Sequence, residues 1–94
     1  MIAPSDIPPM EAFMWPIIER LKAHGRSLSN AEMLQDVAQH MALSEEAMSV
    51  RHGKWNQLVV DQRLGFARSW LKLGGAIDNS QRGVWSLTAD GLAM

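Results

Sequence analysis

The side chains that could bind a charged partner are concentrated in the second half of this sequence. Six of the nine Lys and Arg residues lie between residues 51 and 82, together with only two of the ten acidic residues. Residues 1–50 have the opposite balance, with three basic and seven acidic residues. Because Lys and Arg neutralise phosphate groups, this distribution predicts one basic face, although the formal net charge is only −1. The alternative is that blocks this small even out once the chain folds.

Amide side chains accompany these basic residues. Asn and Gln match the hydrogen-bonding edge of adenine, and Arg matches that of guanine, so the combination is typical of a protein that binds DNA. Arg51 and Lys54 precede a predicted helix, whose N-terminal N–H groups would add to a phosphate site. The residues that we predict to contact DNA are Arg51, Lys54, Asn56, Gln57, Gln62, Arg68, Lys72, Gln81 and Arg82.

The sequence does not offer side chains in the spacing that catalysis requires. His24, His40 and His52 fall on different predicted elements, and no two have the i, i+4 spacing of a helical metal pair. Glu45 and Glu46 are adjacent and fit solvated charges better than an acid–base pair. There is also no glycine-rich phosphate loop. We therefore expect no catalysis within these residues, and no metal, cofactor or small-molecule substrate.

Length and composition indicate a single domain. A chain of 94 residues with no cysteine has neither a disulfide framework nor a thiolate zinc site, which suits a reducing compartment. The start, MIAPSDIPPM, lacks the features of a signal peptide, and no apolar run is long enough to span a membrane. We expect a cytoplasmic protein without membrane contact, formed by residues 1–94 with a loosely ordered leader at residues 1–8.

Hydrophobic periodicity predicts two helices in the first half. The first covers residues 10–24, where Pro16 implies either a kink or a start near residue 13, and Gly25 ends it. The second opens with a capping box formed by Ser29 and Glu32. A short strand at Leu28 fits just before it. Residues 44–55 break the period and read as a loop with room for one helical turn.

A third helix is predicted from about residue 56 to the Gly74–Gly75 pair. Placed at 100° per residue, its apolar side chains fall in one wide arc that we expect to face the core. The arc contains Val59, Val60, Leu64, Phe66, Ala67, Trp70 and Leu71. The opposite face contains Asp61, Gln62, Gly65, Arg68, Ser69 and Lys72.

Two residues of this helix need a separate interpretation. Arg63 falls inside the apolar arc, and a partly buried arginine pairs with a carboxylate or with backbone carbonyls, so we predict a structural role. The candidate acids are Glu11, Glu19 and Asp36. Gly65 either thins the polar face, so that a phosphate can approach the backbone, or permits a close contact with a neighbouring helix.

The C-terminal segment predicts a β-hairpin. AID, a turn NSQRG and VWSLT form two short strands, in which Trp85 and Leu87 point to one side as the anchor to the core. Thr88 can cap a last helical turn. The order helix, short strand, helix, loop, helix, hairpin predicts a mainly α winged helix-turn-helix, in which the third helix can enter the major groove and the hairpin is the wing.

Two sequence blocks carry a resemblance to a known family. DQRLGFARSWLKLGGAID and RGVWSLTADG resemble the N-terminal domain of Mrr-type restriction endonucleases. Gln62 stands where the family pattern has Asn. The matching positions are Arg63, Leu64, Gly65, Phe66, Ala67, Arg68, Leu71, Lys72, Arg82, Gly83, Val84, Trp85, Leu87, Thr88 and Gly91.

The resemblance implies a winged-helix module that binds double-stranded DNA. In such proteins it precedes a PD-(D/E)xK nuclease domain that cleaves DNA bearing modified bases, so methylated DNA is an expected ligand. No nuclease domain falls within residues 1–94, and we expect either an excised domain or a stand-alone binding protein.

The function predicted from the sequence is DNA binding, with the third helix in the major groove and the wing on the flanking backbone. Affinity without base contacts would be on the order of 10⁻⁴–10⁻⁶ M, so dimerisation or tethering to a second domain is expected to raise it. The alternative is a winged helix used for protein interaction or oligomerisation, which the near-neutral charge and four Trp residues favour.

Overall fold

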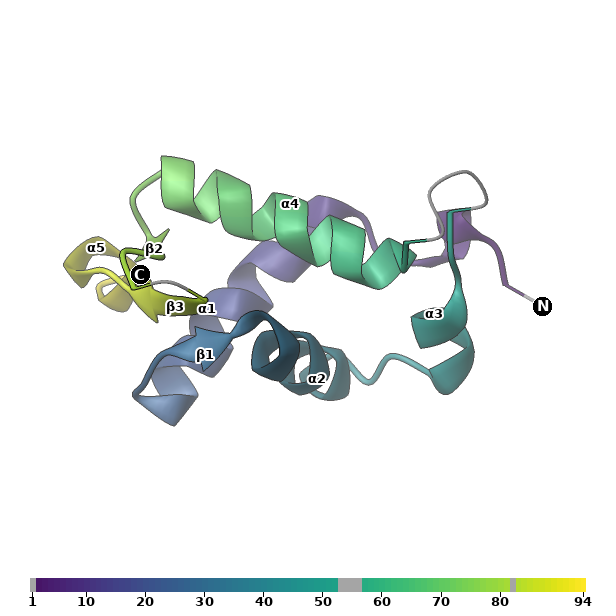
Figure 1. Ribbon diagram of the computed structural model, residues 1–94, viewed down its shortest axis with the longest axis horizontal. Coiled ribbons are helices and arrows are strands. Elements are labelled where there is room, and N and C mark those ends of the chain that lie inside the picture. Colours follow the sequence, from purple (N-terminus) through teal and green to yellow (C-terminus); the bar gives the residue numbers. More distant parts are fainter. Residues whose placement is uncertain (1, 53–56, 82) are drawn as a thin grey trace.

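The computed structural model describes residues 2–52, 57–81 and 83–94. Five α-helices, two 3₁₀ turns and one three-stranded sheet are found in these residues (Figure 1). In chain order they are η1 (Pro4–Asp6), η2 (Met10–Phe13), α1 (Met14–His24), β1 (Leu28–Ser29), α2 (Asn30–His40), α3 (Glu45–Ser49), α4 (Val59–Leu73), β2 (Ile77–Asp78), β3 (Val84–Leu87) and α5 (Ala89–Leu92).

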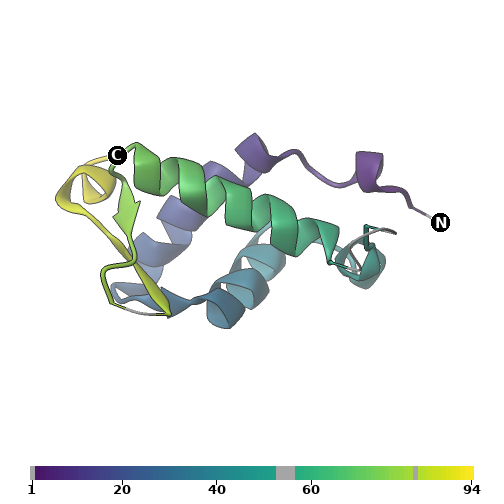
Figure 2. The same ribbon diagram turned by 45° about the horizontal axis from the view of Figure 1, so that its top comes forward.

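The longest helix, α4, lies across α1, with the sheet at one end and α3 at the other (Figures 1 and 2). The sheet is antiparallel in the order β1-β3-β2, so that β3 is central. Trp85 of β3 is opposite Leu28 of β1, and Leu87 is opposite Ile77 of β2. Trp85 and Leu87 pack against the buried core, as the alternation of the predicted hairpin required.

Local sequence signals fixed both ends of α1. The helix begins at Met14, so Pro16 is its third residue. The N–H groups of the first turn have no partner within the helix, and a proline there removes no helical hydrogen bond. Gly25 ends the helix with a φ of 64°, a left-handed conformation that glycine adopts without strain, and its N–H donates to the Leu21 carbonyl at 3.1 Å. Of the two predicted alternatives for Pro16, the start near residue 13 is the one observed.

The predicted capping box at the start of α2 is present. The Ser29 hydroxyl accepts from the Glu32 N–H at 3.1 Å, and the Glu32 carboxylate accepts from the Ser29 N–H at 2.9 Å. Within the predicted loop, Ser44 caps α3 by accepting from the Ala47 N–H at 3.0 Å. One helical turn therefore forms where the sequence left room for it.

The start of α4 differs from the prediction. The sequence placed it near residue 56, whereas the helix begins at Val59. Leu58 is extended, with a ψ of 129°, and pairs with Arg51 in an isolated antiparallel bridge. The His52 N–H donates to the Gln57 carbonyl and the Val59 N–H to the Val50 carbonyl, both at 2.9 Å. These bonds hold residues 57 and 58 in an extended conformation, so the helix cannot begin before Val59.

The buried face of α4 is also rotated from its predicted position. Arg68, predicted on the solvent face, has only 8% of its surface exposed. Phe66 and Trp70, predicted in the core, are 53% and 55% exposed. Hydrophobic periodicity places charged side chains outside, but α2 and β3 cover the Arg68 side of the helix and leave the Phe66–Trp70 side open. Trp70 is therefore not part of the buried core.

The chain closes through a tight junction between α5 and the start of β2. The Thr88 hydroxyl accepts from the Gly91 N–H at 3.0 Å, and the Thr88 N–H donates to the Ala76 carbonyl at 3.0 Å. A Cβ atom at Gly91 would lie 2.0 Å from the Ala76 carbonyl oxygen. The glycine is therefore required by the close approach of two backbones.

We expect Gly91→Ala to destabilise the protein by about 3 kcal/mol, because the added methyl group must displace backbone rather than a flexible side chain. Urea unfolding followed by circular dichroism measures this loss. Gly74→Ala is the matched control, since Gly74 has a right-handed conformation and its added Cβ would lie at an ordinary contact distance of 3.5 Å from the Trp70 carbonyl oxygen. Equal stability of the two variants would show that the close approach of the Ala76 carbonyl does not require a glycine at position 91.

An ion pair joins α1 to α2. The Arg20 Nε–H donates to the Asp36 carboxylate at 2.7 Å, and His24 Nε2 lies 3.0 Å from the other carboxylate oxygen. The hydrogen bond from Arg20 holds the pKa of Asp36 below its ordinary value of 3.8. Because the pKa is depressed in the folded state, the resulting stabilisation is complete above the unfolded pKa and is lost as the pH falls through the folded one.

Asp36→Asn should therefore lower the Tm at pH 7 and have progressively less effect as the pH falls below 3.8. Thermal unfolding of both proteins across pH 2–7 checks this, with the exposed Asp90→Asn as control. A Tm difference that stays constant down to pH 2 would show that the carboxylate charge of Asp36 does not stabilise the fold.

Candidate nucleic-acid interface

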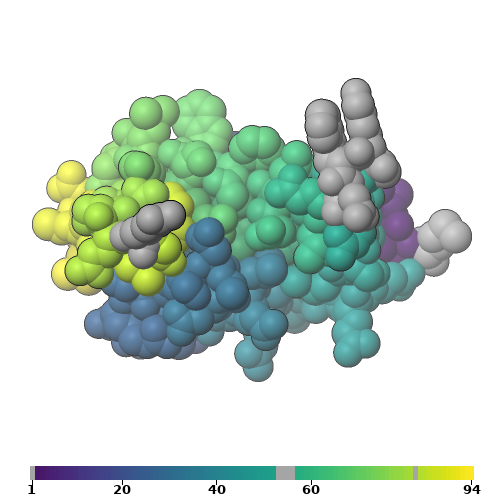
Figure 3. Space-filling model, in the orientation of Figure 1, coloured from purple at the N-terminus to yellow at the C-terminus, as the bar shows by residue number. Residues whose placement is uncertain are grey.

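One face of the molecule presents α4 beside the turn of the β2–β3 hairpin. In Figure 3, α4 crosses this face in green, with the hairpin in yellow-green near one end and α2 in blue below it. Asp78 organises the start of the hairpin turn by accepting from the N–H and hydroxyl of Ser80 at 3.2 and 3.1 Å. Gln81, predicted to contact DNA, is exposed in this turn.

A shallow hollow lies along the side of α4. It brings together three of the predicted DNA contacts, Gln57, Gln62 and Arg68, with Asp61, Gly65 and Ser69 completing its polar lining. Gln57 reaches the hollow from the extended segment before α4 rather than from the helix itself. The side of α4 that surrounds Gly65 is therefore open and mainly polar, with Phe66 as the apolar residue at the hollow.

Arg68 forms the floor of this hollow. Its guanidinium lies 5.6 Å from the centre of the Trp85 ring, and its Nη1 lies 4.0 Å from the Met33 sulfur. Nε is buried and has no hydrogen-bond partner among the described residues. Burial lowers the pKa of Arg68, while the charge of Asp61 acts in the opposite direction without forming an ion pair.

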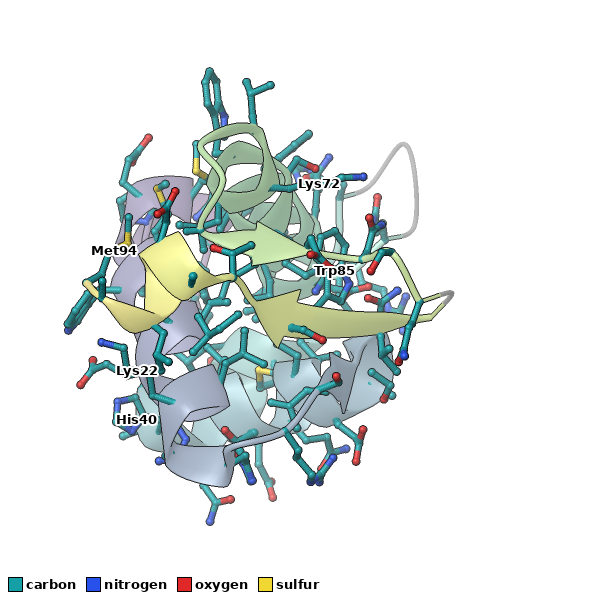
Figure 4. All side chains as sticks on the ribbon, turned by 90° about the vertical axis from the view of Figure 1, so that its left-hand side faces the viewer. Lys22, His40, Lys72, Trp85 and Met94 are labelled. Carbon is teal, nitrogen blue, oxygen red and sulfur yellow. The ribbon has the colours of Figure 1, made fainter. Side chains whose placement is uncertain are left out.

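Besides its contact with Arg68, the Trp85 side chain is held by a hydrogen bond to α2. Its indole Nε1–H donates to the Asn30 side-chain oxygen, at the start of α2, at 2.7 Å. Figure 4 shows Trp85 and Lys72 on the same side of the molecule, with Lys22, His40 and Met94 on the other. Lys72 is exposed. One side of α4 thus carries a fixed guanidinium and a free-standing ammonium within one helical turn.

Arg51, another predicted contact, is not among the residues that line the hollow and is exposed at the bridge that precedes α4. Lys54, Asn56 and Arg82 lie outside the described residues.

Arg63 makes backbone contacts. Its Nη1 donates to the carbonyls of Ile7 and Pro8 at 2.7 and 3.2 Å. Among the described residues, Arg63 therefore bonds backbone carbonyls rather than the carboxylates of Glu11, Glu19 or Asp36. Ile7 is 3% exposed and belongs to the core. The leader, expected to be loosely ordered, is therefore held against α4 at this point.

Asn30 and Met33 were missed by the sequence analysis. Both support Arg68, Asn30 through the Trp85 indole and Met33 through its sulfur. Neither residue type nor local spacing indicates this, because the three elements meet only in the folded protein. The one signal in the sequence is that Trp85 belongs to the hairpin that follows the helix of Arg68. A hairpin strand that packs on this helix can bring Trp85 against Arg68, 17 residues before it.

We expect Arg63→Met to release the leader, because the carbonyls of Ile7 and Pro8 lose their donor. Hydrogen exchange at residues 2–8 should accelerate, and stability should fall by about 2 kcal/mol. Lys72→Met is the matched control on the exposed side of the same helix. Unchanged exchange in the leader of the Arg63 variant would contradict the role of this contact.

The element order, the antiparallel sheet and the hairpin beside α4 define the winged-helix class. The chain belongs to the Mrr N-terminal domain family, whose model matches residues 11–94. No match was found among curated proteins or among solved structures. No described helix is long and apolar enough to cross a membrane. The described residues also contain no group of three His, Cys, Asp or Glu side chains placed to hold a metal ion.

Proposed function

We propose that this protein is the DNA-binding module of a restriction system that targets modified DNA. The observation that carries the proposal is the open polar side of α4 in a winged helix of the Mrr family, where Gln62 and Arg68 line one hollow and Lys72 lies on the same side of the molecule as Trp85 of the hairpin. In winged helices this helix can lie in the major groove and the wing can contact the flanking backbone. Cleavage would be performed by a nuclease domain outside these residues.

The amide and hydroxyl groups of the hollow suit contacts with base edges. Gln62 can donate to and accept from adenine, and Ser69 can bond either kind of base. The Ser69 hydroxyl donates to the Gly65 carbonyl at 3.1 Å, which leaves its lone pairs facing outward as acceptors. Lys72, exposed one turn further along, suits a phosphate contact, because an extended ammonium binds phosphate as a point charge.

A second candidate function is docking of a protein partner. Phe66, Trp70 and Leu73 are spaced i, i+4, i+7 on α4 and are 53%, 55% and 79% exposed, which forms an apolar stripe beside the polar side. Such a stripe favours a partner domain or a second copy of the chain. Phe66 also lines the polar hollow, whereas Trp70 and Leu73 do not, so variants at Trp70 can separate the two functions.

Fluorescence anisotropy with methylated and unmethylated duplexes over a salt series tests the DNA proposal. We expect Lys72→Ala to weaken binding to all duplexes similarly and to reduce the slope of log K against log salt by about one unit. Lys22→Ala, on the opposite side of the molecule, should leave the slope unchanged. Absence of binding by the unaltered protein at low salt would refute DNA binding by this domain.

The docking alternative has its own measurement. Trp70→Ser should leave DNA binding intact under the DNA proposal. Under the alternative it should abolish self-association measured by sedimentation.

A further inference from the structure

Arg68 is a buried charge without a counter-charge. Only 8% of its surface is exposed, and no described carboxylate forms an ion pair with it. Taking a guanidinium out of water is costly unless an anion or good acceptors replace the lost hydration. Burial lowers the pKa of Arg68, and the charge of Asp61 opposes this shift without forming an ion pair with the guanidinium. The site is electrostatically incomplete within the described protein.

The two edges of the guanidinium are in different environments. Nη1 is turned toward the Met33 sulfur, a weak acceptor, at 4.0 Å. Nη2 lies beside Gly65, on the side of the hollow. Nε, which shares an edge with Nη2, has no hydrogen-bond partner. A guanidinium edge with two neighbouring N–H donors matches two oxygens of a phosphate or carboxylate.

Gly65 lies over the Nη2 end of this edge, on the side of the hollow, whereas Nε lies deeper and is buried. A Cβ atom at Gly65 would lie 3.5 Å from Arg68 Nη2, at ordinary contact distance. A methyl group there would therefore fit without strain, yet it would stand between Nη2 and the hollow. Glycine inside a helix costs stability relative to alanine, so its presence here is not explained by the fold. Neither predicted alternative for Gly65 included this relation to Arg68.

We propose that Arg68 is a preformed receptor for one phosphate group of the DNA backbone, admitted over Gly65. This inference rests on the proposed function and names the contact that the hollow makes. The guanidinium is held ready by the Trp85 ring, which Asn30 fixes, so little side-chain freedom is lost when the anion binds.

The buried position of the Arg68 guanidinium favours a phosphate over a base edge as its ligand. Base edges form the floor of a groove and are reached by side chains that project outward from a helix. Arg68 does not project, because it lies below the surface between α4, α2 and β3. Phosphate oxygens protrude from the duplex and can enter a recess. The contact would therefore contribute affinity and position α4 without selecting sequence.

Two variants test the receptor without damaging the fold. Gly65→Ala should reduce affinity for every duplex about tenfold and lower the salt slope by about one unit, while helix propensity raises the Tm. Arg68→Met should likewise reduce affinity and the salt slope. It should not lower the Tm, because a neutral side chain packs between Met33 and Trp85 without the cost of a buried charge. Gly74→Ala is the matched control, which should leave DNA affinity unchanged.

A structural role for Arg68 predicts the opposite stability result. If the guanidinium served mainly to join α2, α4 and β3, Arg68→Met would lower the Tm. That outcome, or wild-type affinity in both variants alongside salt-dependent binding by the parent protein, would overturn the receptor and leave DNA binding in place. A loss that depends on the base sequence would also overturn it, in favour of base reading.

Side-chain NMR gives a direct readout of the site. The buried Nε–H of Arg68 should exchange slowly enough to be observed, and we expect its resonance to shift on addition of duplex at micromolar concentration and of inorganic phosphate only at millimolar concentration. Arg20 Nε, already bonded to Asp36, is the internal control. A shift with inorganic phosphate but none with duplex would overturn the assignment to DNA. Absence of duplex binding in anisotropy would refute the proposed function itself.

Discussion

Burial of the Arg68 side chain beside Met33 and Trp85 is the packing constraint that sets the orientation of α4. The long apolar stem of the arginine occupies a place between α2 and β3 that a core residue would normally fill. Since a helix can bury only part of its circumference, burial of Arg68 moves Phe66 and Trp70 to the surface.

This rotation gives α4 three sides with different properties. One side packs on the core through Val60, Leu64 and Leu71. A second, around Gly65, is polar and is deepened by the missing side chain. A third carries the exposed Phe66–Trp70–Leu73 stripe, with Arg63 beside it holding the leader. A single helix therefore carries a polar hollow and an apolar stripe, which meet at Phe66.

The fold was largely predictable because its signals are local. The capping box at Ser29, the left-handed Gly25 and the Thr88 cap each depend on residues within four positions of one another. The alternation around Trp85 likewise predicted the side of the hairpin that packs on the core. The start of α4 was not predictable, because the hydrogen bonds that keep Leu58 extended come from a segment before it that the helical period does not describe.

The candidate site was predicted by composition rather than by geometry. Gln57, Gln62 and Arg68 meet at one hollow, but the sequence placed Arg68 in solvent and did not include Asn30 or Met33. By itself, the sequence determined the elements, their caps and the winged-helix order, because these follow from spacing along the chain. Only the tertiary structure decided which part of α4 faces inward and what lies around Arg68. The period of a helix fixes the angles between its side chains, whereas neighbours distant in the sequence fix the direction of the buried face.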